Sequence, residues 1–472
     1  MRILLIACYE LGHQPLSLAW PLAFLKRAGF EAEALDLSVQ TLDEAVLRQA
    51  DFIGVAAPMH TALRLGARIA ERVRALNPHA HLCFYGLYAQ LNAQLLFDRK
   101  LADSVIAGEA EAALVELVRA LSAGEDWRRI RGVMTAGAAP APVLTRLSFP
   151  TPERASLPPL TRYARYVSDS LTPALSHGER EWRVREELAG YVEASRGCLH
   201  TCTHCPIVPI YNGRFFVVPA EVVLADIEQQ VAAGARHITF GDPDFLNGPK
   251  HALRLARELH ARWPALTFDF TTKVEHILQH RALFPEFAQL GATFVVSAIE
   301  SVSDHVLQRL RKGHTAADIE AALEILDDAG LALQPTFVAF TPWTTLEDYL
   351  AQLEFIRKHG LIQHVPPVQF AIRLLLPPGS PLVHAPDAAA WLGELDAEAF
   401  GYRWSHPDPR MDALYVQVAA RVAEAQACNE PFAATFEAVC RLAYRMAGRT
   451  PPSDVPSAQR PSPPRLTEDW FC

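Results

Sequence analysis

Short apolar runs alternate with amphipathic stretches in the first part of the chain. The apolar runs lie at Arg2–Cys8, Glu31–Leu37, Phe52–Ala57, His81–Tyr85 and Ser104–Ala107. Stretches with helical spacing, such as Leu18–Ala28 and Ala62–Leu76, lie between them. Buried strands that alternate with helices predict a doubly wound, Rossmann-like parallel sheet.

Ligands of such sheets bind beyond the carboxyl ends of the strands. The loops that follow the predicted strands are Tyr9–Pro15, Pro58–Thr61, Gly86–Gln90 and Gly108–Glu111. We therefore expect these four loops to carry any binding site of the first domain.

A second alternation of strands and helices runs from Tyr191 to Leu382. The predicted strands are Gly190–Ala194, His237–Phe240, Thr267–Thr271, Phe294–Ile299, Gln334–Phe340 and Val368–Leu376, and helices such as Pro219–Ala233, Lys250–Arg262 and Ala316–Ala329 fill the gaps. Six βα units predict a partial (β/α)6 barrel of the TIM type, because a full barrel has eight. In this architecture the loops at the strand carboxyl ends form the site.

The remaining segments are less regular. Within the turn-rich linker, Ser168–Glu181 (SDSLTPALSHGERE) fits neither periodicity, which is typical of a surface insertion or an ordinary polar loop, and we expect no chemistry there. Pro386–Met446 is predicted to be mostly helical, and the proline-rich end is predicted to be extended or mobile. The predicted divisions are 1–131 for the Rossmann-like domain, 132–189 for the linker, 190–385 for the barrel, 386–450 for the helical region and 451–472 for the tail.

Composition and charge restrict the cellular compartment and the class of partner that we expect. Of 472 residues 50% are hydrophobic, yet no apolar run is long enough to span a bilayer. The start, MRILLIACYE, lacks the features of a signal peptide and is predicted to be a buried strand. A net charge of −9 argues against a general nucleic-acid surface. Eight cysteines in a chain of this length favour a reducing compartment, so we expect a cytoplasmic protein.

The chemistry of the chain centres on Cys198, Cys202 and Cys205 in RGCLHTCTHCP, directly after the first predicted barrel strand. Three thiolates suit a [4Fe–4S] cluster that keeps one iron open. A structural zinc site needs a fourth ligand, which His200 or His204 would supply. Spacing alone leaves iron–sulfur, zinc and ordinary thiols as alternatives.

Several motifs in order resemble the radical S-adenosylmethionine (SAM) superfamily, from Gly190 to about Leu382. The cysteines match the C-x3-C-x2-C cluster ligands of that family, although His204 replaces its usual aromatic residue. In FGDPDFLNG, Asp242 and Asp244 match the acidic strand end that holds the methionine amino group. The resemblance further implies that Thr271 and Lys273 of TTKVEHIL, and Glu300 of VVSAIESVSDHVLQRLRKGHT, face the cofactor.

The resemblance implies that the open iron chelates the amino and carboxylate groups of SAM. The reduced cluster then donates an electron and breaks a carbon–sulfur bond, and the 5′-deoxyadenosyl radical abstracts hydrogen from the substrate. Each of these charged residues also has an explanation that involves no cofactor. Asp242 and Asp244 flank a proline in a sequence typical of a turn. Glu300 could cap a helix or lie at the surface, and Lys273 could be a solvated residue at the rim of the barrel.

The N-terminal sheet resembles the cobalamin-binding domain that precedes many radical SAM barrels. Pro15–Ser38 and Ser104–Leu117 carry this resemblance, but the D-x-H-x-x-G cobalt-ligand motif is absent. We interpret His13, in the first loop, as an ordinary loop histidine. Bound cobalamin and a sheet retained only for substrate or partner contact are both compatible with the sequence.

The C-terminal RLTEDWFC (Arg465–Cys472) resembles the tail of a radical SAM subfamily that ends in Cys-selenocysteine-Ala-Glu-Pro or Cys-Cys-Ala-Glu-Pro. Two further segments, Gly197–Phe215 and Gln369–Leu382, also resemble that subfamily. We expect that a UGA codon follows Cys472 and that the chain is truncated there; the alternative is a chain that ends in an exposed cysteine. A thiol on such a tail is a catalytic candidate. Cys428 and Cys440 are interpreted as buried structural cysteines.

The sequence therefore predicts a radical SAM enzyme with an N-terminal cobalamin-binding-like domain. Its expected cofactors are a [4Fe–4S] cluster, SAM and optionally cobalamin, and its expected partner is an electron donor such as flavodoxin or ferredoxin. With cobalamin, methyl transfer to a carbon or phosphorus centre of an unknown small molecule or peptide is the favoured chemistry. Without cobalamin, hydrogen abstraction or transfer of another part of SAM is favoured. The alternative is a non-catalytic iron–sulfur or zinc protein that senses metal or redox state.

Overall fold

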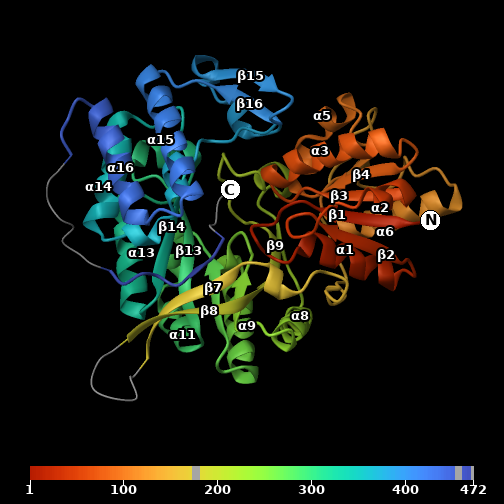
Figure 1. Ribbon diagram of the computed structural model, residues 1–472, viewed down its shortest axis with the longest axis horizontal. Helices are drawn as coiled ribbons and strands as arrows, with labels where there is room; N and C mark the ends of the chain where they lie inside the picture. The colour runs from red at the N-terminus through yellow and green to blue at the C-terminus, as the bar shows by residue number, and fades with distance from the viewer. Residues whose placement is uncertain (173–180, 452–459, 469–472) are drawn as a thin grey trace.

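The computed structural model describes residues 1–172, 181–451 and 460–468. Two sheets lie side by side, the N-terminal one at the right of Figure 1 and the barrel sheet at its centre. Helices of the C-terminal region lie at the upper left of Figure 1, on the side of the barrel away from the N-terminal sheet. Among the described helices, none combines the length and the apolar character that crossing a membrane requires.

The N-terminal sheet has the strand order β2-β1-β3-β4-β5-β6. The first five strands are parallel and match the sequence prediction, whereas the short β6 is antiparallel. The strands are β1 (Ile3–Ala7), β2 (Ala32–Asp36), β3 (Phe52–Ala56), β4 (His81–Tyr85), β5 (Ser104–Ile106) and β6 (Val133–Met134).

Helices cover both faces of this sheet because its strands are apolar on both sides. In β1, Leu5 packs toward the face covered by α1 (Leu16–Arg27) and α6 (Ala110–Ala123). Its neighbour Ile6 packs in the core of the opposite face. That face is covered by α2 (Glu44–Gln49), α3 (His60–Leu76), α4 (Leu87–Leu91) and α5 (Ala93–Asp98). The predicted doubly wound domain is confirmed.

The second sheet has the order β14-β13-β12-β11-β8-β7-β17, where β17 is Arg465–Leu466, and forms a curled half-barrel. Five of its strands are parallel: β8 (Glu181–Val192), β11 (His237–Phe240), β12 (Thr267–Thr271), β13 (Ala292–Glu300) and β14 (Ala332–Phe337). The helices of this domain are α8 (Ala220–Ala232), α9 (Pro249–Arg262), α10 (Val274–Gln279), α11 (Phe284–Gln289), α12 (Asp304–Leu310), α13 (Ala316–Ala329) and α14 (Leu346–Lys358).

The sixth predicted strand, Val368–Leu376, is wrong in most of its length. Pro367–Ala371 forms a 3-10 helix, and a single parallel bridge joins Phe340 to Arg373. Prolines lack the N–H that a ladder needs, and they flank this segment on both sides. The sixth position of the half-barrel is therefore occupied by an extended segment with only one bridge.

The linker contains more regular structure than its composition predicts. β7 (Arg165–Thr172) pairs antiparallel with β8, in a register that joins Arg165 to Leu188 and Thr172 to Glu181. The ends of the predicted insertion Ser168–Glu181 therefore belong to strands, and its centre lies outside the described residues. The polar residues between β7 and β8 made the sequence on either side look like a loop, so the two strands were not predicted.

The C-terminal region is helical only in part. The helices α15 (Pro409–Ala427) and α16 (Phe432–Met446) confirm the prediction, but β15 (Leu392–Asp396) and β16 (Gly401–Trp404) form a hairpin instead of helix. Asp396 turns the chain, because its Oδ1 accepts from the backbone N–H groups of Glu398 and Ala399. The hairpin turn places Phe400 in the core of the N-terminal domain.

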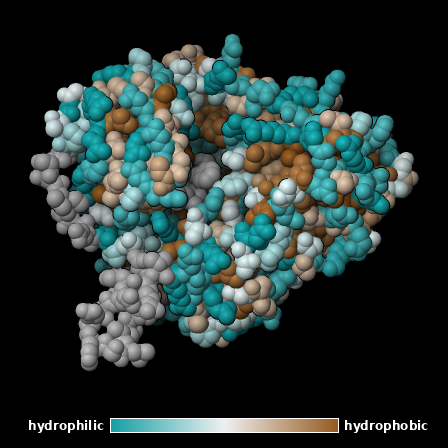
Figure 2. All heavy atoms as spheres, viewed as in Figure 1, coloured by the Kyte–Doolittle hydropathy of each residue, from teal (hydrophilic) through white to brown (hydrophobic). Residues whose placement is uncertain are grey.

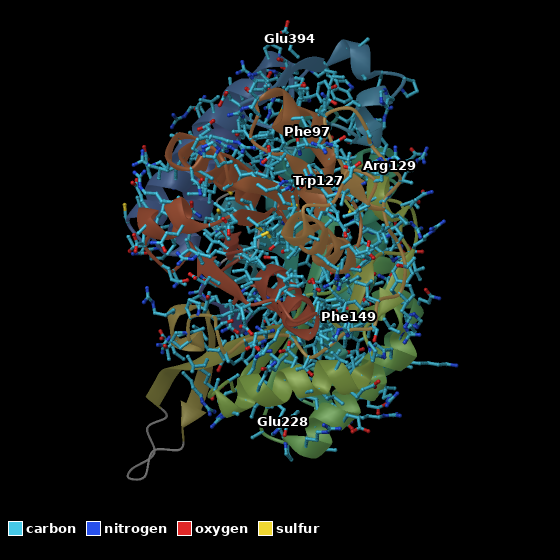
Figure 3. All side chains as sticks on the ribbon, turned by 90° about the vertical axis from the view of Figure 1, so that its right-hand side faces the viewer. Phe97, Trp127, Arg129, Phe149, Glu228 and Glu394 are labelled. Atoms are coloured by element: carbon cyan, nitrogen blue, oxygen red, sulfur yellow. The ribbon has the colours of Figure 1, made fainter. Side chains whose placement is uncertain are left out.

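Linker residues join the two domains. Phe149, labelled in Figure 3, packs against Trp20 and Phe24 of α1 with ring centroids 4.9 and 6.1 Å apart. Arg154 is buried and forms a two-pronged ion pair with Asp226 of α8, at 2.6 and 2.8 Å. Its Nη1 also donates to Gln14 of the first loop. These contacts fix the strand ends of one sheet against the barrel.

Candidate active site

The cysteine loop begins where a turn of the backbone requires glycine. After β8, the short strands β9 (Ser195–Gly197) and β10 (Phe215–Val217) pair, and α7 (Val208–Tyr211) lies between them. Gly197 has φ +77°, and a Cβ there would lie 2.4 Å from the carbonyl oxygen of Arg214. Only glycine fits this position, which directs the following residues over the end of the barrel.

All three cysteines of the loop line one cavity. Cys202 is buried, and Cys198 and Cys205 are partly exposed. Burial raises the pKa of the Cys198 thiol, and it raises the pKa of Cys205 to about 12. Asn247 donates to Sγ of Cys198 at 3.6 Å. Thiols of this kind ionise when a metal supplies positive charge, so the three side chains fit a metal cluster.

The cavity has a volume of about 520 Å³ and lies between the two sheets. Figure 2 shows apolar side chains, in brown, where the two halves of the molecule meet. Each of the four loops predicted at the strand ends of the first domain contributes to the lining, for example through Glu10, Met59, Gly86 and Glu109. One cavity therefore joins the cysteine loop to the ligand edge of the N-terminal sheet.

The two acidic residues of the D-P-D sequence occupy different positions. Asp242 lines the cavity and accepts from the backbone N–H of Ala194 and from the hydroxyl of Ser195. Burial raises the pKa of Asp242 to about 7. Asp244 lies behind the wall, with both carboxylate oxygens bonded within the protein.

The carboxylate of Asp244 organises the histidines near the cysteine loop. Its oxygens accept from Thr272 at 2.7 Å and from His200 at 3.2 Å, and Nδ1 of His276 lies 2.8 Å away. Although burial alone would raise it, these partners hold the pKa of Asp244 well below its usual range. Asp244 thus positions side chains beside the cavity.

Glu300 ends β13 in a left-handed conformation, with φ +68°, and lines the cavity. Its Oε1 accepts from Nζ of Lys312 at 3.2 Å and from Nε2 of His204 at 3.1 Å. Burial would raise the pKa of Glu300, but Lys312 and His204 lower it to about 2. Glu300 is therefore neither a helix cap nor a surface residue.

Thr271 and Lys273 also line the cavity. Nζ of Lys273 donates to Nδ1 of His200 at 3.1 Å and to Glu275 at 3.1 Å. Both ring nitrogens of His200 are thus bonded to protein, and His204 bonds Glu300. His200 cannot act as the fourth zinc ligand without breaking these bonds. Nδ1 of His204 is buried and has no partner among the described residues, so the zinc alternative stays open for His204.

Within the described part of the chain, the ligand atoms of His200, Asp244 and His276 lie within 4.8 Å of one another. The ammonium group of Lys273 lies beside this group and opposes a cation there. These three side chains are better explained as a hydrogen-bonded network that supports the cysteine loop than as a metal site.

The structure also places His13 and two of the cysteines outside the cysteine motif. His13 is buried, its ring stacks on Tyr191 with centroids 4.2 Å apart, and burial lowers its pKa to about 3. Cys440 is buried as predicted, but the prediction for Cys428 is wrong, because it lies exposed at the C-terminal end of α15. Cys472 lies outside the described residues.

Two groups that line the cavity were not predicted from the sequence. Arg196, next to the cysteine motif, forms buried ion pairs with Glu109 and Glu111 of the first domain. The described end of the tail, through Arg465 and Glu468, also reaches the lining. The sequence shows Arg196 beside the first cysteine and Glu109 after the fifth strand, but their ion pair joins two domains and no local pattern predicts it.

Comparison with known proteins agrees with this architecture. Residues 192–353 match the radical SAM superfamily, and residues 2–118 match the B12 binding domain. The hopanoid C-3 methylase of Methylococcus capsulatus is 22% identical over 339 residues, which cover 70% of this chain and 62% of that protein. The chain therefore spans less than two thirds of that curated relative.

Two solved structures share the fold. The radical S-adenosylmethionine methyltransferase TsrM from Kitasatospora setae has a TM-score of 0.57 at 18% identity, over 75% of this chain and 70% of that one. The cobalamin-dependent S-adenosylmethionine radical enzyme OxsB has a TM-score of 0.69 at 16% identity, over 89% of this chain and 67% of that one. This chain thus combines a B12-binding domain with a radical SAM domain.

The residues present fit the cofactors that these domains imply. A radical SAM domain implies a [4Fe–4S] cluster and SAM, and three cysteines share the cavity with the polar residues Asp242 and Thr271. A B12-binding domain supports cobalamin, and apolar side chains such as Trp20 and Met59 line the strand-end side of the same cavity. The sequence predictions of fold class and cofactors are confirmed.

Proposed function

We propose that the protein is a cobalamin-dependent radical SAM enzyme that transfers a methyl group to a small molecule or peptide. The observation that carries the proposal is one cavity lined by both the cysteine loop of the radical SAM domain and the strand-end loops of the B12-binding domain. Reactive groups that must exchange a fragment need such a shared, enclosed space.

Within this proposal Cys198, Cys202 and Cys205 hold the [4Fe–4S] cluster. Asp242, Thr271, Lys273 and Glu300 contact SAM, and their position on the cavity wall supports this assignment. Asp244 lies behind the wall, which favours a positioning role over direct contact with the methionine amino group.

The bound cofactors supply an electron for cleavage of SAM and a carrier for the methyl group. The protein orients them and excludes water. Arg196 and its carboxylate partners hold the two domains at a fixed separation, and the buried Glu300–Lys312 pair fixes polar groups beside the cysteine loop. These side chains keep the cysteine loop beside the strand-end loops, where the reacting groups must meet.

The test uses anaerobically purified and reconstituted full-length protein. Iron and sulfide are counted, and EPR spectra of the reduced protein are recorded with and without SAM. A [4Fe–4S] signal that changes on addition of SAM, with release of 5′-deoxyadenosine under reducing conditions, supports the proposal. About one zinc per chain with no iron would establish the alternative, a metal-binding or redox-sensing protein. Cobalamin is detected by its absorbance after reconstitution.

The reaction needs a reductant, and we propose a flavodoxin or ferredoxin in the cytoplasm as its source. The reducing environment that eight cysteines favour supports this setting. Reduction of the cluster by purified flavodoxin or ferredoxin, followed by EPR, tests the partner. A cluster reduced only by dithionite would argue against both.

The likeness to the selenocysteine-containing subfamily rests on RLTEDWFC and on two further segments, Gly197–Phe215 and Gln369–Leu382. We propose Cys472 as a redox-active residue of the tail. The decisive observation is the gene sequence after the codon for Cys472. UGA followed by codons for Ala-Glu-Pro supports this assignment, and any other stop codon removes it.

A further inference from the structure

The barrel interior contains a buried carboxylate that is only half satisfied. Asp269 lies in β12, has 2% of its surface exposed, and lines the cavity. Its Oδ1 accepts from Nε2 of His237 at 2.8 Å and from Oγ1 of Thr239 at 2.6 Å. Among the residues that the structure describes, none donates a hydrogen bond to Oδ2.

The local sequence places this carboxylate inside the barrel. In β12, TFDFT alternates, and Phe268 and Phe270 pack in the aromatic core outside the sheet. Asp269 therefore points to the opposite face, which encloses the cavity. It lies two residues before Thr271, about 7 Å deeper than the strand end.

The carboxylate of Asp269 has one basic neighbour in the described chain. Nε2 of His237 lies 2.8 Å from Oδ1, and no lysine or arginine of the described chain forms an ion pair with Asp269. His237 and Thr239 both meet Oδ1, so the lone pairs of Oδ2 stay available to a ligand in the cavity. An ammonium group is the donor that best matches a carboxylate oxygen, because its hydrogen bonds are strengthened by charge.

The surroundings of Asp269 suit a hydrocarbon chain. Phe294 of β13 is its register partner, and Phe294 and Val296 both line the cavity. A ligand with an ammonium group at Asp269 would lay its carbon skeleton along these side chains toward the cysteine loop. The interior thus offers one anionic end and an apolar wall.

We propose that Asp269 binds a protonated amine of the substrate, and that the substrate is an organic amine whose carbon skeleton lies between Asp269 and the cysteine loop. This inference rests on the proposed function. It adds a substrate class and a specificity-determining residue in the barrel, away from the residues assigned to the cofactors.

The test measures binding of n-butylammonium, 1-butanol and butyrate to full-length reconstituted protein by ligand-observed NMR, without SAM or reductant. Wild-type protein should bind n-butylammonium most tightly. Asp269→Asn should weaken that binding about tenfold or more, because the amide still accepts from His237 and Thr239 but carries no charge. Glu193→Gln removes a carboxylate from another part of the same cavity and should leave the affinity unchanged.

The inference is overturned if Asp269→Asn binds n-butylammonium as wild type does, or if Glu193→Gln weakens it equally. It is also overturned if wild-type protein prefers butyrate or 1-butanol, an outcome that needs no variant to fold. Because these measurements involve no turnover, their failure leaves the SAM-dependent EPR result intact, whereas failure of the proposed function appears in the EPR result itself.

Discussion

Arg196 of the barrel and Glu109 of the N-terminal domain form a buried ion pair, with Nη1 of Arg196 2.8 Å from Oε2 of Glu109. Arg196 also lies 2.6 Å from Glu111, and its guanidinium lies over the ring of Phe149. One side chain, two residues before the first cysteine of the motif, therefore joins the cysteine loop to the first domain.

Replacement of Arg196 by methionine should weaken the junction. Glu109 and Glu111 would remain buried without their cation, which costs about 3–5 kcal/mol of unfolding free energy. Differential scanning calorimetry should show a lower Tm and two separate transitions for the two domains. Arg128→Met is the matched control, because the ion pair of Arg128 with Asp126 is exposed and its loss should leave the profile unchanged. A single unshifted transition in Arg196→Met would contradict the role of this pair.

Serine at Cys198, Cys202 or Cys205 should abolish cluster binding. Each substitution removes one of three thiolates, so we expect iron to fall from about four per chain to below one after anaerobic reconstitution. Cys428→Ser removes an exposed thiol outside the cavity and should retain the iron of wild-type protein. Iron and sulfide analysis with absorbance near 400 nm measures the effect, and equal loss in Cys428→Ser would argue against the assignment.

Deletion of residues 460–472 should open one side of the cavity. In the described part of the tail, β17 pairs with β7, the hydroxyl of Tyr9 donates to Glu468, and Arg460 forms an ion pair with Asp327. Without these contacts, hydrogen–deuterium exchange should increase in β7 at Tyr166 and Val167. Exchange in β1 and β3 of the other sheet serves as the internal control. Unchanged protection of β7 would show that the tail is not held there.

Glu10→Gln should flatten the dependence of stability on pH. Burial raises the pKa of Glu10 from 4.5 to about 8, with further raising by Glu193 and Asp36 and opposing hydrogen bonds from Ser17. The folded protein thus binds a proton that the unfolded chain releases, so this contribution is complete below pH 4.5 and is lost as pH rises toward about 8.

Urea unfolding at pH 5 and at pH 8 measures this effect. The fall in unfolding free energy between the two values should be smaller in Glu10→Gln than in wild-type protein, and the amide keeps one acceptor oxygen for the start of α1. Glu33→Gln, on an exposed position of β2, should retain the wild-type fall. An equal fall in all three proteins would contradict the burial of a protonated Glu10.

The sequence predicted the elements whose local pattern is unambiguous. Short apolar runs separated by helical stretches identified β1 to β5 and β11 to β13, because a strand buried on both faces is apolar at most positions. This pattern did not identify the chain near Arg373, where prolines limit the ladder to one bridge, or the β15–β16 hairpin, where Asp396 makes a turn that composition does not reveal.

The sequence by itself determined the two sheet domains and the three cysteines, because periodicity and close spacing are properties of neighbouring residues. Only the tertiary structure decided that Asp242 lines the cavity while Asp244 lies behind it, although the two are separated by one proline. It also decided that Tyr9 meets Glu468, 459 positions away. Contacts between distant segments depend on how whole domains pack, and no local pattern in the chain specifies that packing.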